Sequence, residues 1–438
     1  MLDIKFIREN PEKLKEALKN RGAEFDLEYL LGLDEKRRAK IKEVDDLRAR
    51  QNELSSKIAK ASHESHETRS REMGEAKGLK AKLGDAEFEL KALEEEFNEL
   101  VYKIPNLPLD EVPIGKSELD NVVLREVGKK PKFSFTPKDH LELAAKLDII
   151  DFETAAKVSG SDFYYLKNEG VLLELALVRY ALDFLVKKGF TPMITPDMAR
   201  SKFYLGTGYM PRGSEAQTYI IENTDLGLIA TAEIPLAGIH ADEILDGVKL
   251  PYKYAGYSHC FRQESGSYGK YSKGLYRVHQ FTKVEMFVYC RPEDSSKIHE
   301  ELLEHEEEMW RGLKIPYRVV EMCTGDLGAQ AARKFDLEAW MPGRSTSLSE
   351  PRSKGAGQGD WGEVTSTSNT TDYQTRRLGI KYRGNDGKTE YAHTLNGTAI
   401  ATSRAIIAIL ENYQQKDGSV KIPEVLRPHM GGLGMIER

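Results

Sequence analysis

The sequence lacks three features that would point to particular classes of protein. Its three cysteines, Cys260, Cys290 and Cys323, are far apart, so neither a disulfide framework nor a cysteine-rich zinc site is expected. No apolar run approaches the ~20 residues that span a bilayer, and the N-terminus has no apolar signal segment. These absences predict a cytoplasmic protein with no membrane partner.

The two common nucleotide-binding loops are also missing. The chain has no GxxxxGK[ST] loop and no GxGxxG segment opening a βαβ unit. Its net charge is −6, so the chain as a whole does not attract nucleic acid. Phosphates would therefore have to be held by individual arginines and a metal ion, and RNA by a local basic surface.

What the sequence does contain first is a helical hairpin. From Leu79 to Ile104 the apolar residues recur in alternating steps of four and three, which is the seam of a coiled coil. A shorter seam with the same spacing runs from Val44 to Ile58. The polar stretch 61–78 is expected to be the tip where the chain reverses, so the segment predicts two antiparallel helices.

The two predicted helices differ in charge. Residues 35–60 hold nine Lys/Arg and five Asp/Glu, whereas residues 71–103 hold six and nine. One interpretation is that two solvated faces attract each other across the hairpin. The other is that the first helix offers its cations to a phosphate backbone, where affinity is mostly electrostatic. The sequence leaves both open.

With 438 residues the chain is too long for one ordinary core, and its pattern suggests where to divide it. Three prolines and a loss of periodicity mark a linker at 105–120. We therefore expect an N-terminal helical domain at 1–104 and a second domain at 121–438. In the second, residues 171–186 predict a buried helix, and the prolines in GFTPMITPDM favour a strand at an edge or interface after it.

Strand-like segments of the second domain carry polar side chains on one face. In the predicted strand 277–289, alternation separates an apolar face from one with Arg277, His279, Phe281, Lys283 and Glu285. Similar i, i+2 pairs occur at Arg262 and Glu264, at Thr231 and Glu233, and at Asn396 and Thr398. A solvated outer face is the alternative for any one strand, but the recurrence favours one shared pocket on an antiparallel sheet.

Arg404 is the only charged residue between Ala399 and Leu410, in a predicted apolar helix. Because burying an unpaired guanidinium is costly, Arg404 is expected to meet a carboxylate or a phosphate. A purely structural ion pair is the alternative to a ligand-binding role.

Together these segments resemble the signature motifs of the class II aminoacyl-tRNA synthetases, and specifically the seryl-tRNA synthetase family, over essentially the whole chain. The matching segments are GFTPMITP, TAEIPL, FRQE through RVHQFTKVE, EVTSTSNTTDYQTRR and NGTAIATSRAIIAILEN, preceded by the helical arm. The resemblance implies an α+β protein: an antiparallel coiled-coil arm followed by a catalytic domain on an antiparallel sheet flanked by helices. It also implies a ligase that activates L-serine with ATP and loads it onto tRNA(Ser), with tRNA(Sec) as a further tRNA substrate.

The resemblance assigns roles to individual residues. For ATP it implies Arg262 at the α-phosphate, Arg404 at the γ-phosphate, and adenine between Phe281 and Arg277 with Glu264 accepting from its amino group. For serine it implies Thr231, Glu233, Arg262, Glu285, Asn396 and Thr398. Glu363 and Ser366 match the family's Mg²⁺ ligands, and their spacing of three predicts a bulge or bend in the strand. A homodimer, with the arm of each subunit gripping tRNA, is also implied.

Two departures from the family pattern stand out. A Ser/Gly-rich insertion between Gly343 and Glu363 predicts a flexible surface loop, with covering the site or touching the acceptor stem as a hypothesis. Thr367 replaces a cysteine, and the cysteine pattern of the zinc-dependent branch is missing, so no zinc is expected. The competing hypotheses are an adenylating paralogue that loads a carrier protein, a non-catalytic RNA-binding paralogue, and a synthetase for threonine or proline.

Overall fold

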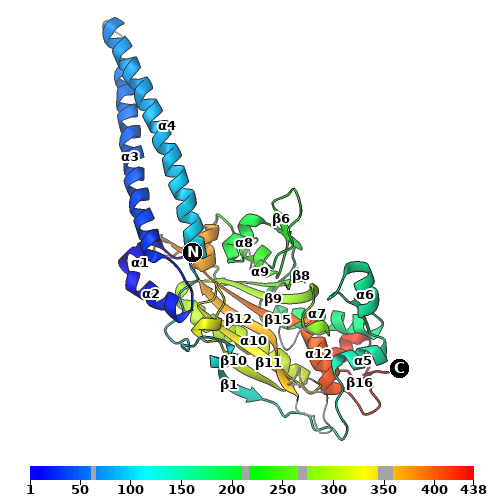
Figure 1. Ribbon diagram of the computed structural model, residues 1–438. Helices are drawn as coiled ribbons and strands as arrows, with labels where there is room; N and C mark the ends of the chain where they lie inside the picture. The colour runs from blue at the N-terminus through cyan, green and yellow to red at the C-terminus, as the bar shows by residue number, and fades with distance from the viewer. Residues whose placement is uncertain (61–65, 210–216, 265–273, 344–358) are drawn as a thin grey trace. The chain divides into compact units, whose positions relative to one another are not determined.

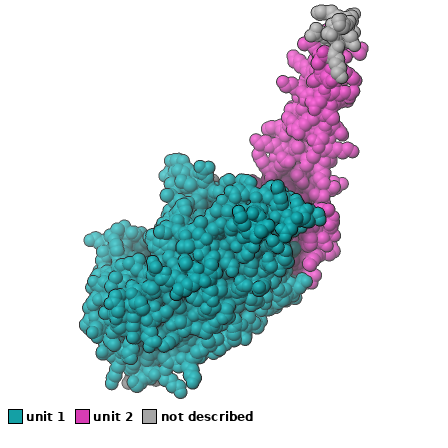
Figure 2. Space-filling model, turned by 180° about the vertical axis from the view of Figure 1, so that it is seen from behind, with its two compact units in different colours: residues 1, 20–22, 106–438 teal, residues 2–19, 23–105 magenta. Residues whose placement is uncertain are grey.

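The computed structural model contains two compact units, coloured separately in Figure 2. It describes residues 1–60, 66–209, 217–264, 274–343 and 359–438. The smaller unit comprises residues 2–19 and 23–105, and the larger comprises residues 1, 20–22 and 106–438. No helix in the described stretches is long and apolar enough to cross a membrane.

The smaller unit is helical, and its two long helices form the predicted hairpin. Its helices are α1 (Ile4–Glu9), α2 (Pro11–Asn20), α3 (Leu27–Lys60) and α4 (His66–Lys103). α3 and α4 run side by side (Figure 1). Val44, Leu83 and Ala86 are buried together between them, which confirms the predicted coiled-coil seam.

The predicted tip of the hairpin was too long. α4 already begins at His66, so residues 66–78, expected to lie in the turn, are helical. They are rich in Glu, Arg, Lys, Met and Ala, which are strong helix formers, and the helix needs no apolar stripe where it continues a packed one. Only 61–65 of the predicted tip lie outside the described residues.

Ion pairs between the two long helices account for part of their charge difference. Lys40 Nζ lies 2.7 Å from a carboxylate oxygen of Glu89, and Arg48 Nη2 lies 2.7 Å from one of Glu87. The predicted attraction between the two faces is therefore confirmed at these positions. Exposed pairs of this kind each contribute about 0.2–1 kcal/mol, so the apolar seam dominates the stability of the hairpin.

The larger unit is built on an eight-stranded sheet within the described residues. In sheet order its strands are β1 (Val122–Val127), β10 (Tyr317–Glu321), β11 (Arg333–Met341), β12 (Asp360–Thr371), β15 (His393–Ala401), β9 (Gln280–Cys290), β8 (Tyr252–Phe261) and β4 (Thr191–Ile194). All neighbouring pairs are antiparallel except β4 with β8. The predicted antiparallel sheet is confirmed, and so is the edge position of the proline-containing strand β4.

One face of this sheet is covered by helices. They are α5 (His140–Leu147), α7 (Glu169–Lys187), α10 (Ser295–Leu313) and α12 (Thr402–Tyr413), and α7 confirms the helix predicted at 171–186. Val284 and Met286 of β9 and Leu337 of β11 are fully buried in the core between the sheet and these helices. Burying such side chains contributes about 1.5–3 kcal/mol each, so this face is the main core of the unit.

The opposite face of β9 is divided along its length. Phe287 and Tyr289 pack in a second apolar cluster with Leu236 of the short helix α9 (Glu233–Gly238). Further along the strand, Phe281, Lys283 and Glu285 point to the same side, as the alternation predicted, but they line a cavity instead. The site therefore occupies the part of this sheet face that the second cluster leaves uncovered.

Candidate active site

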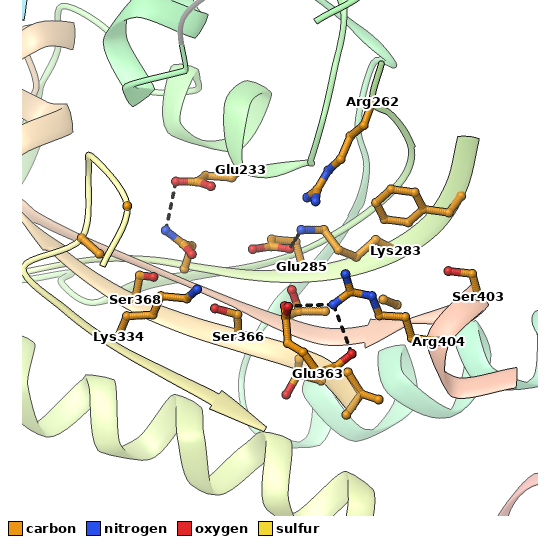
Figure 3. Close-up of a pocket in the computed structure, with 18 of the residues that line it drawn as sticks. Glu233, Arg262, Lys283, Glu285, Lys334, Glu363, Ser366, Ser368, Ser403 and Arg404 are labelled. Carbon is orange, nitrogen blue, oxygen red and sulfur yellow. Dashed lines mark hydrogen bonds and ion pairs between the residues drawn. The ribbon is translucent and has the colours of Figure 1, made fainter. Parts of the chain in front are cut away.

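The cavity has a volume of about 260 Å³ and is shown in Figure 3. Strands β9, β12 and β15 form its floor, and the first turn of α12 contributes Ser403 and Arg404. Of the predicted site residues, all but Thr231 and Arg277 line it: Glu233, Arg262, Glu264, Phe281, Glu285, Glu363, Ser366, Asn396, Thr398 and Arg404.

Glu233 is a buried carboxylate held by three hydrogen-bond donors. Its Oε1 accepts from Gln374 Nε2 at 2.7 Å and from Asn396 Nδ2 at 2.9 Å, and its Oε2 accepts from the Tyr209 hydroxyl at 3.1 Å. Burial, reinforced by the nearby charge of Glu285, raises the pKa of Glu233 to about 7. Its carboxyl group is thus oriented and poised to bind a cation.

The segment that carries Thr231 and Glu233 is not a strand, so that prediction was wrong. Glu233 begins α9, and the Thr231 hydroxyl accepts a hydrogen bond from the Glu233 amide at 3.2 Å. A threonine hydroxyl that bonds a backbone N–H two residues on favours a helix start over a strand ladder. Thr231 is buried and does not line the cavity.

Arg262 and Glu264 both line the cavity, but not by sharing a strand face. β8 ends at Phe261, and Glu264 has a φ of +49°, a left-handed conformation that no strand contains. The Arg262 guanidinium carbon lies 5.3 Å from the centroid of the Phe281 ring. Among the described residues no carboxylate pairs with Arg262, so its charge is available to a ligand.

Arg277 precedes β9, so the strand begins three residues later than predicted. The short turn Gly274–Tyr276 comes just before it, and the amide of His279 bonds Asp162 rather than β8. Arg277 Nη1 lies 3.0 Å from Glu264 Oε2, outside the cavity lining. This ion pair holds Glu264 in place at the edge of the cavity.

Arg404 meets the carboxylate that its sequence context predicted. Its Nη1 lies 2.9 Å from Glu363 Oε1 and also donates to the Glu363 carbonyl at 3.2 Å, while its guanidinium lies over the Tyr276 ring. Burial opposes ionisation of Glu363, but the charges of Arg404 and Lys334 outweigh it and lower the pKa of that carboxyl to about 2. Glu363 is therefore ionised at neutral pH.

A β-bulge lies between Glu363 and Ser366, and it confirms the predicted irregularity. In the pairing of β12 with β11, Thr365 is opposite Leu337 and Glu363 is opposite Glu338, so Val364 is the extra residue. Val364 packs in the main core and also borders the cavity, which Glu363 and Ser366 line with polar groups. The bulge brings the carboxylate of Glu363 and the hydroxyl of Ser366 to one side of the strand.

Other cavity residues were not assigned to the site from the sequence. Lys283 Nζ lies 2.5 Å from Glu285 Oε2, and both side chains are buried. Lys334 Nζ lies 3.3 Å from Asp336 Oδ1, and both residues are on β11. Burial raises the pKa of Asp336 to about 6, although the charge of Lys334 acts to lower it. The sequence had placed Lys283 on a polar strand face, but no local pattern around Lys334 indicated that it belongs to the site.

Two sequence departures have different outcomes. Thr367 is fully buried and its hydroxyl donates to the Asn396 carbonyl at 2.9 Å, so it supports the strand that carries Asn396. Most of the insertion predicted between Gly343 and Glu363, residues 344–358, lies outside the described residues, but its last residues, Asp360–Gly362, belong to β12 and are not a loop.

Comparison with protein families places this sheet and cavity in a known class. Residues 218–413 match the tRNA synthetase class II core domain (G, H, P, S and T), so the larger unit is that of a class II aminoacyl-tRNA synthetase. Residues 1–108 match the seryl-tRNA synthetase N-terminal domain. The two matches together identify both the core and the arm.

Similar proteins match this chain over nearly its full length. Serine–tRNA ligases of Dictyoglomus thermophilum and Rubrobacter xylanophilus are 54% and 53% identical, and the alignments cover 98% of this chain and 98% of each relative. A seryl-tRNA synthetase structure from Pyrococcus horikoshii complexed with ATP is 45% identical with a TM-score of 0.87. One from Naegleria fowleri in complex with AMP is 35% identical with a TM-score of 0.82. Both structural matches cover 100% of this chain and 99% of the other. The chain belongs to the seryl-tRNA synthetase family of ATP-dependent ligases.

Proposed function

We propose that this chain activates L-serine with ATP to form seryl-adenylate, and then transfers the seryl group to the 3′-terminal adenosine of tRNA(Ser). The observation that carries this proposal is one cavity that combines buried carboxylates, Glu233 and Glu285, with the arginines Arg262 and Arg404. Carboxylates suit the ammonium of an amino acid, and guanidiniums suit the phosphates of a nucleotide. The ATP and AMP in the two related structures support the second half of this assignment.

Serine would bind at the end of the cavity near Glu233. Glu233 and Glu285 take its ammonium, and Asn396 and Thr398, neighbours on β15, bond its hydroxyl and carboxylate. Thr231 acts through the start of α9, where it orients Glu233. A site built to bond a hydroxyl rejects the analogue that lacks it by about 10⁴–10⁵-fold, so alanine is excluded.

ATP would bind at the end of the cavity near Arg404. Arg262 holds the α-phosphate, and its lack of a carboxylate partner among the described residues supports this role. Arg404 exchanges part of its contact with Glu363 for the γ-phosphate. Adenine stacks on Phe281, with Arg277 covering its other side once that residue leaves Glu264, which then accepts from the adenine amino group.

Glu363 and Ser366 would hold Mg²⁺. They fit this ion because both donors are oxygens, the bulge at Val364 brings them to one side of β12, and Glu363 stays ionised at neutral pH. When bound, the ion supplies positive charge to the triphosphate. Asp336, opposite Ser366 in the sheet, is paired with Lys334 and does not line the cavity.

Adenylation needs no general base, because the serine carboxylate is already ionised. The cavity residues position that carboxylate in line with the α-phosphate, and Arg262 neutralises the charge that develops on it. In the second step a terminal ribose hydroxyl of tRNA attacks the seryl carbonyl and AMP leaves. Positioning and charge neutralisation are therefore the two tasks of the site.

The helical arm would bind tRNA. We assign residues 1–104 to a tRNA-binding domain, 105–120 to a linker and 121–438 to the catalytic domain. A-form grooves hide base identity, so the arm would recognise the shape and backbone of the RNA, with cations of α3 at its phosphates. The family match of residues 1–108 supports this assignment.

The catalytic unit would form a homodimer through α7 and β4. Val171, Leu172 and Leu175 share one side of α7 and are 39%, 45% and 56% exposed, and Ile194 on the edge strand β4 is 81% exposed. Apolar side chains gathered on two neighbouring elements mark an interaction surface. In such a dimer the arm of one subunit would serve the active site of the other.

Aminoacylation of a tRNA pool tests the proposed function. The wild-type chain should charge serine isoacceptors with serine and not with alanine or threonine, and Arg262→Ala should abolish charging. Serine-dependent pyrophosphate exchange without charging would favour a paralogue that loads a carrier protein. Neither activity would favour the non-catalytic RNA-binding hypothesis.

A further inference from the structure

Lys283 is a buried cation in the cavity to which the proposed function gives no role. The residue is 6% exposed, and its Nζ lies 2.5 Å from Glu285 Oε2. In Figure 3 its amine points into the cavity between Arg262 and Arg404. A buried charge is costly unless it is paired, so its partner must be considered both before and after substrate binds.

The order of side chains on β9 matches the order of groups in seryl-adenylate. Phe281, Lys283 and Glu285 alternate on the cavity face, and each step of two residues spans about 7 Å along a strand. Phe281 is proposed for adenine and Glu285 for the serine ammonium. The position between them therefore faces the middle of the molecule, where the carboxylate joins the α-phosphate.

Serine brings its own cation to Glu285. Its ammonium competes with the ammonium of Lys283 for the same buried carboxylate. The α-phosphate of ATP, which is an anion, would then lie beside Lys283. Lysine carries a point charge with three donors on a flexible stem, so its amine can change partner without moving the strand. If Lys283 exchanges Glu285 for a phosphate oxygen while the serine ammonium binds Glu285, both buried charges stay paired throughout.

We propose that Lys283 binds the α-phosphate during adenylation, and that its ion pair with Glu285 opens when the serine ammonium takes that carboxylate. This inference rests on the proposed function. In the step itself a serine carboxylate oxygen bonds to the α-phosphorus, the bond to the bridging oxygen of pyrophosphate breaks, and its electron pair leaves with pyrophosphate. Lys283 keeps its protons and neutralises the charge on the phosphate, alongside Arg262.

The test is the Lys283→Gln variant of the full chain, because a glutamine amide still donates to Glu285 but has no charge. Serine-dependent ATP–pyrophosphate exchange should show kcat reduced by about 10²–10³-fold, the usual loss for one such electrostatic contact. KM for serine should stay within about threefold of the wild-type value, because Glu233 and Glu285, the carboxylates proposed to bind serine, are unchanged. Lys253→Met, which removes a lysine paired with Glu301 outside the cavity, should leave kcat unchanged.

Binding of serinol separates this role from a structural one. Serinol keeps the ammonium and hydroxyl of serine and has no carboxylate, so its inhibition constant reports the pocket around Glu233 and Glu285 alone. Lys283→Gln and a second variant, Lys283→Met, should bind serinol as well as or better than wild type, since the competing lysine is gone. Retained serinol binding also shows that each variant is folded.

Two results would overturn the inference. One is a normal kcat for Lys283→Gln, and if Lys283→Met then loses kcat, Lys283 only satisfies Glu285. The other is loss of serinol binding together with loss of kcat. Absence of exchange by the wild-type chain would instead contradict the proposed function, so the two failures are distinguishable.

Discussion

Arg404 Nη1 lies 2.9 Å from Glu363 Oε1, so the one charged residue of an apolar helical segment is paired with a carboxylate beside the β-bulge of β12. The pair joins α12 to the cavity floor and places a permanent positive charge there. Because both groups also face the cavity, the ion pair is part of the proposed site and more than a structural contact.

Replacing Arg404 should therefore impair ATP use more than folding. Arg404→Met is expected to lower kcat/KM for ATP by about 10²–10³-fold, as removal of one charged group beside a transferring phosphate does. Arg404→Lys should recover little, because an ammonium cannot reproduce a bidentate guanidinium contact. Pyrophosphate exchange measures both variants. An Arg404→Met enzyme with normal ATP kinetics would make the pair purely structural.

Serine binding should depend on pH through Glu233. Its pKa is raised to about 7, so below that pH an increasing fraction of the carboxyl is neutral and cannot pair with an ammonium. We expect kcat/KM for serine to fall about tenfold per pH unit below pH 7, since this parameter reports the free enzyme. Glu233→Gln should have a lower kcat/KM for serine at every pH, and that kcat/KM should no longer fall below pH 7. A wild-type profile that is flat from pH 5 to 7 contradicts the assignment.

Gly397 has little room for a side chain. A Cβ there would lie 3.0 Å from Glu306 Oε1 and from Thr367 Oγ1, and 3.1 Å from Met286 Cε. Gly397→Ala should cost about 1–3 kcal/mol of stability by overpacking and raise KM for serine, because Asn396 and Thr398 flank it. Urea unfolding measures the first effect. The same change at Gly84 in α4, which has open space around it, should instead be neutral or stabilising by up to about 1 kcal/mol.

Cations of α3 should control tRNA binding without affecting adenylation. Lys42 and Arg50 are exposed on that helix. Lys42→Glu with Arg50→Glu should weaken tRNA binding and reduce its log–log salt slope by about 0.7–0.9 for each phosphate that the arm no longer neutralises. Pyrophosphate exchange should be unchanged. The matched double variant Lys80→Glu and Lys91→Glu on α4 should bind tRNA nearly as wild type does, and equal weakening by both double variants would show only general repulsion.

The apolar surface of α7 and β4 should hold the dimer together. Leu175→Asp or Ile194→Asp places a charge on the proposed interface and should yield monomers in sedimentation velocity, with loss of aminoacylation if the arm acts across subunits. Val248→Asp is the control, because Val248 is 73% exposed elsewhere on the unit and its change should leave the assembly intact. A monomeric wild-type protein would disprove the proposed interface.

Much of the fold was readable from the sequence because it depends on local periodicity. The 4,3 spacing through Leu83 and Ala86 gave the hairpin, and alternation in β9 correctly separated Val284 and Met286 from Lys283 and Glu285. Predictions failed at the ends of elements. At the start of α9 the Thr231 hydroxyl accepts a hydrogen bond from the Glu233 amide, and at Glu264 the backbone turns left-handed. At such positions a few side-chain or backbone bonds outweigh a pattern two residues long.

The sequence by itself determined the hairpin, the antiparallel sheet and the residue types that face the cavity, because periods of 2, 3.5 and 3.6 are properties of neighbouring residues. Only the tertiary structure decided which of those residues are partners. Glu233 gains Gln374 and Asn396, more than a hundred residues away, and Arg404 gains Glu363. Such contacts depend on sheet order and strand register, which bring distant segments together, and on burial, which makes each unpaired charge costly enough to require a partner.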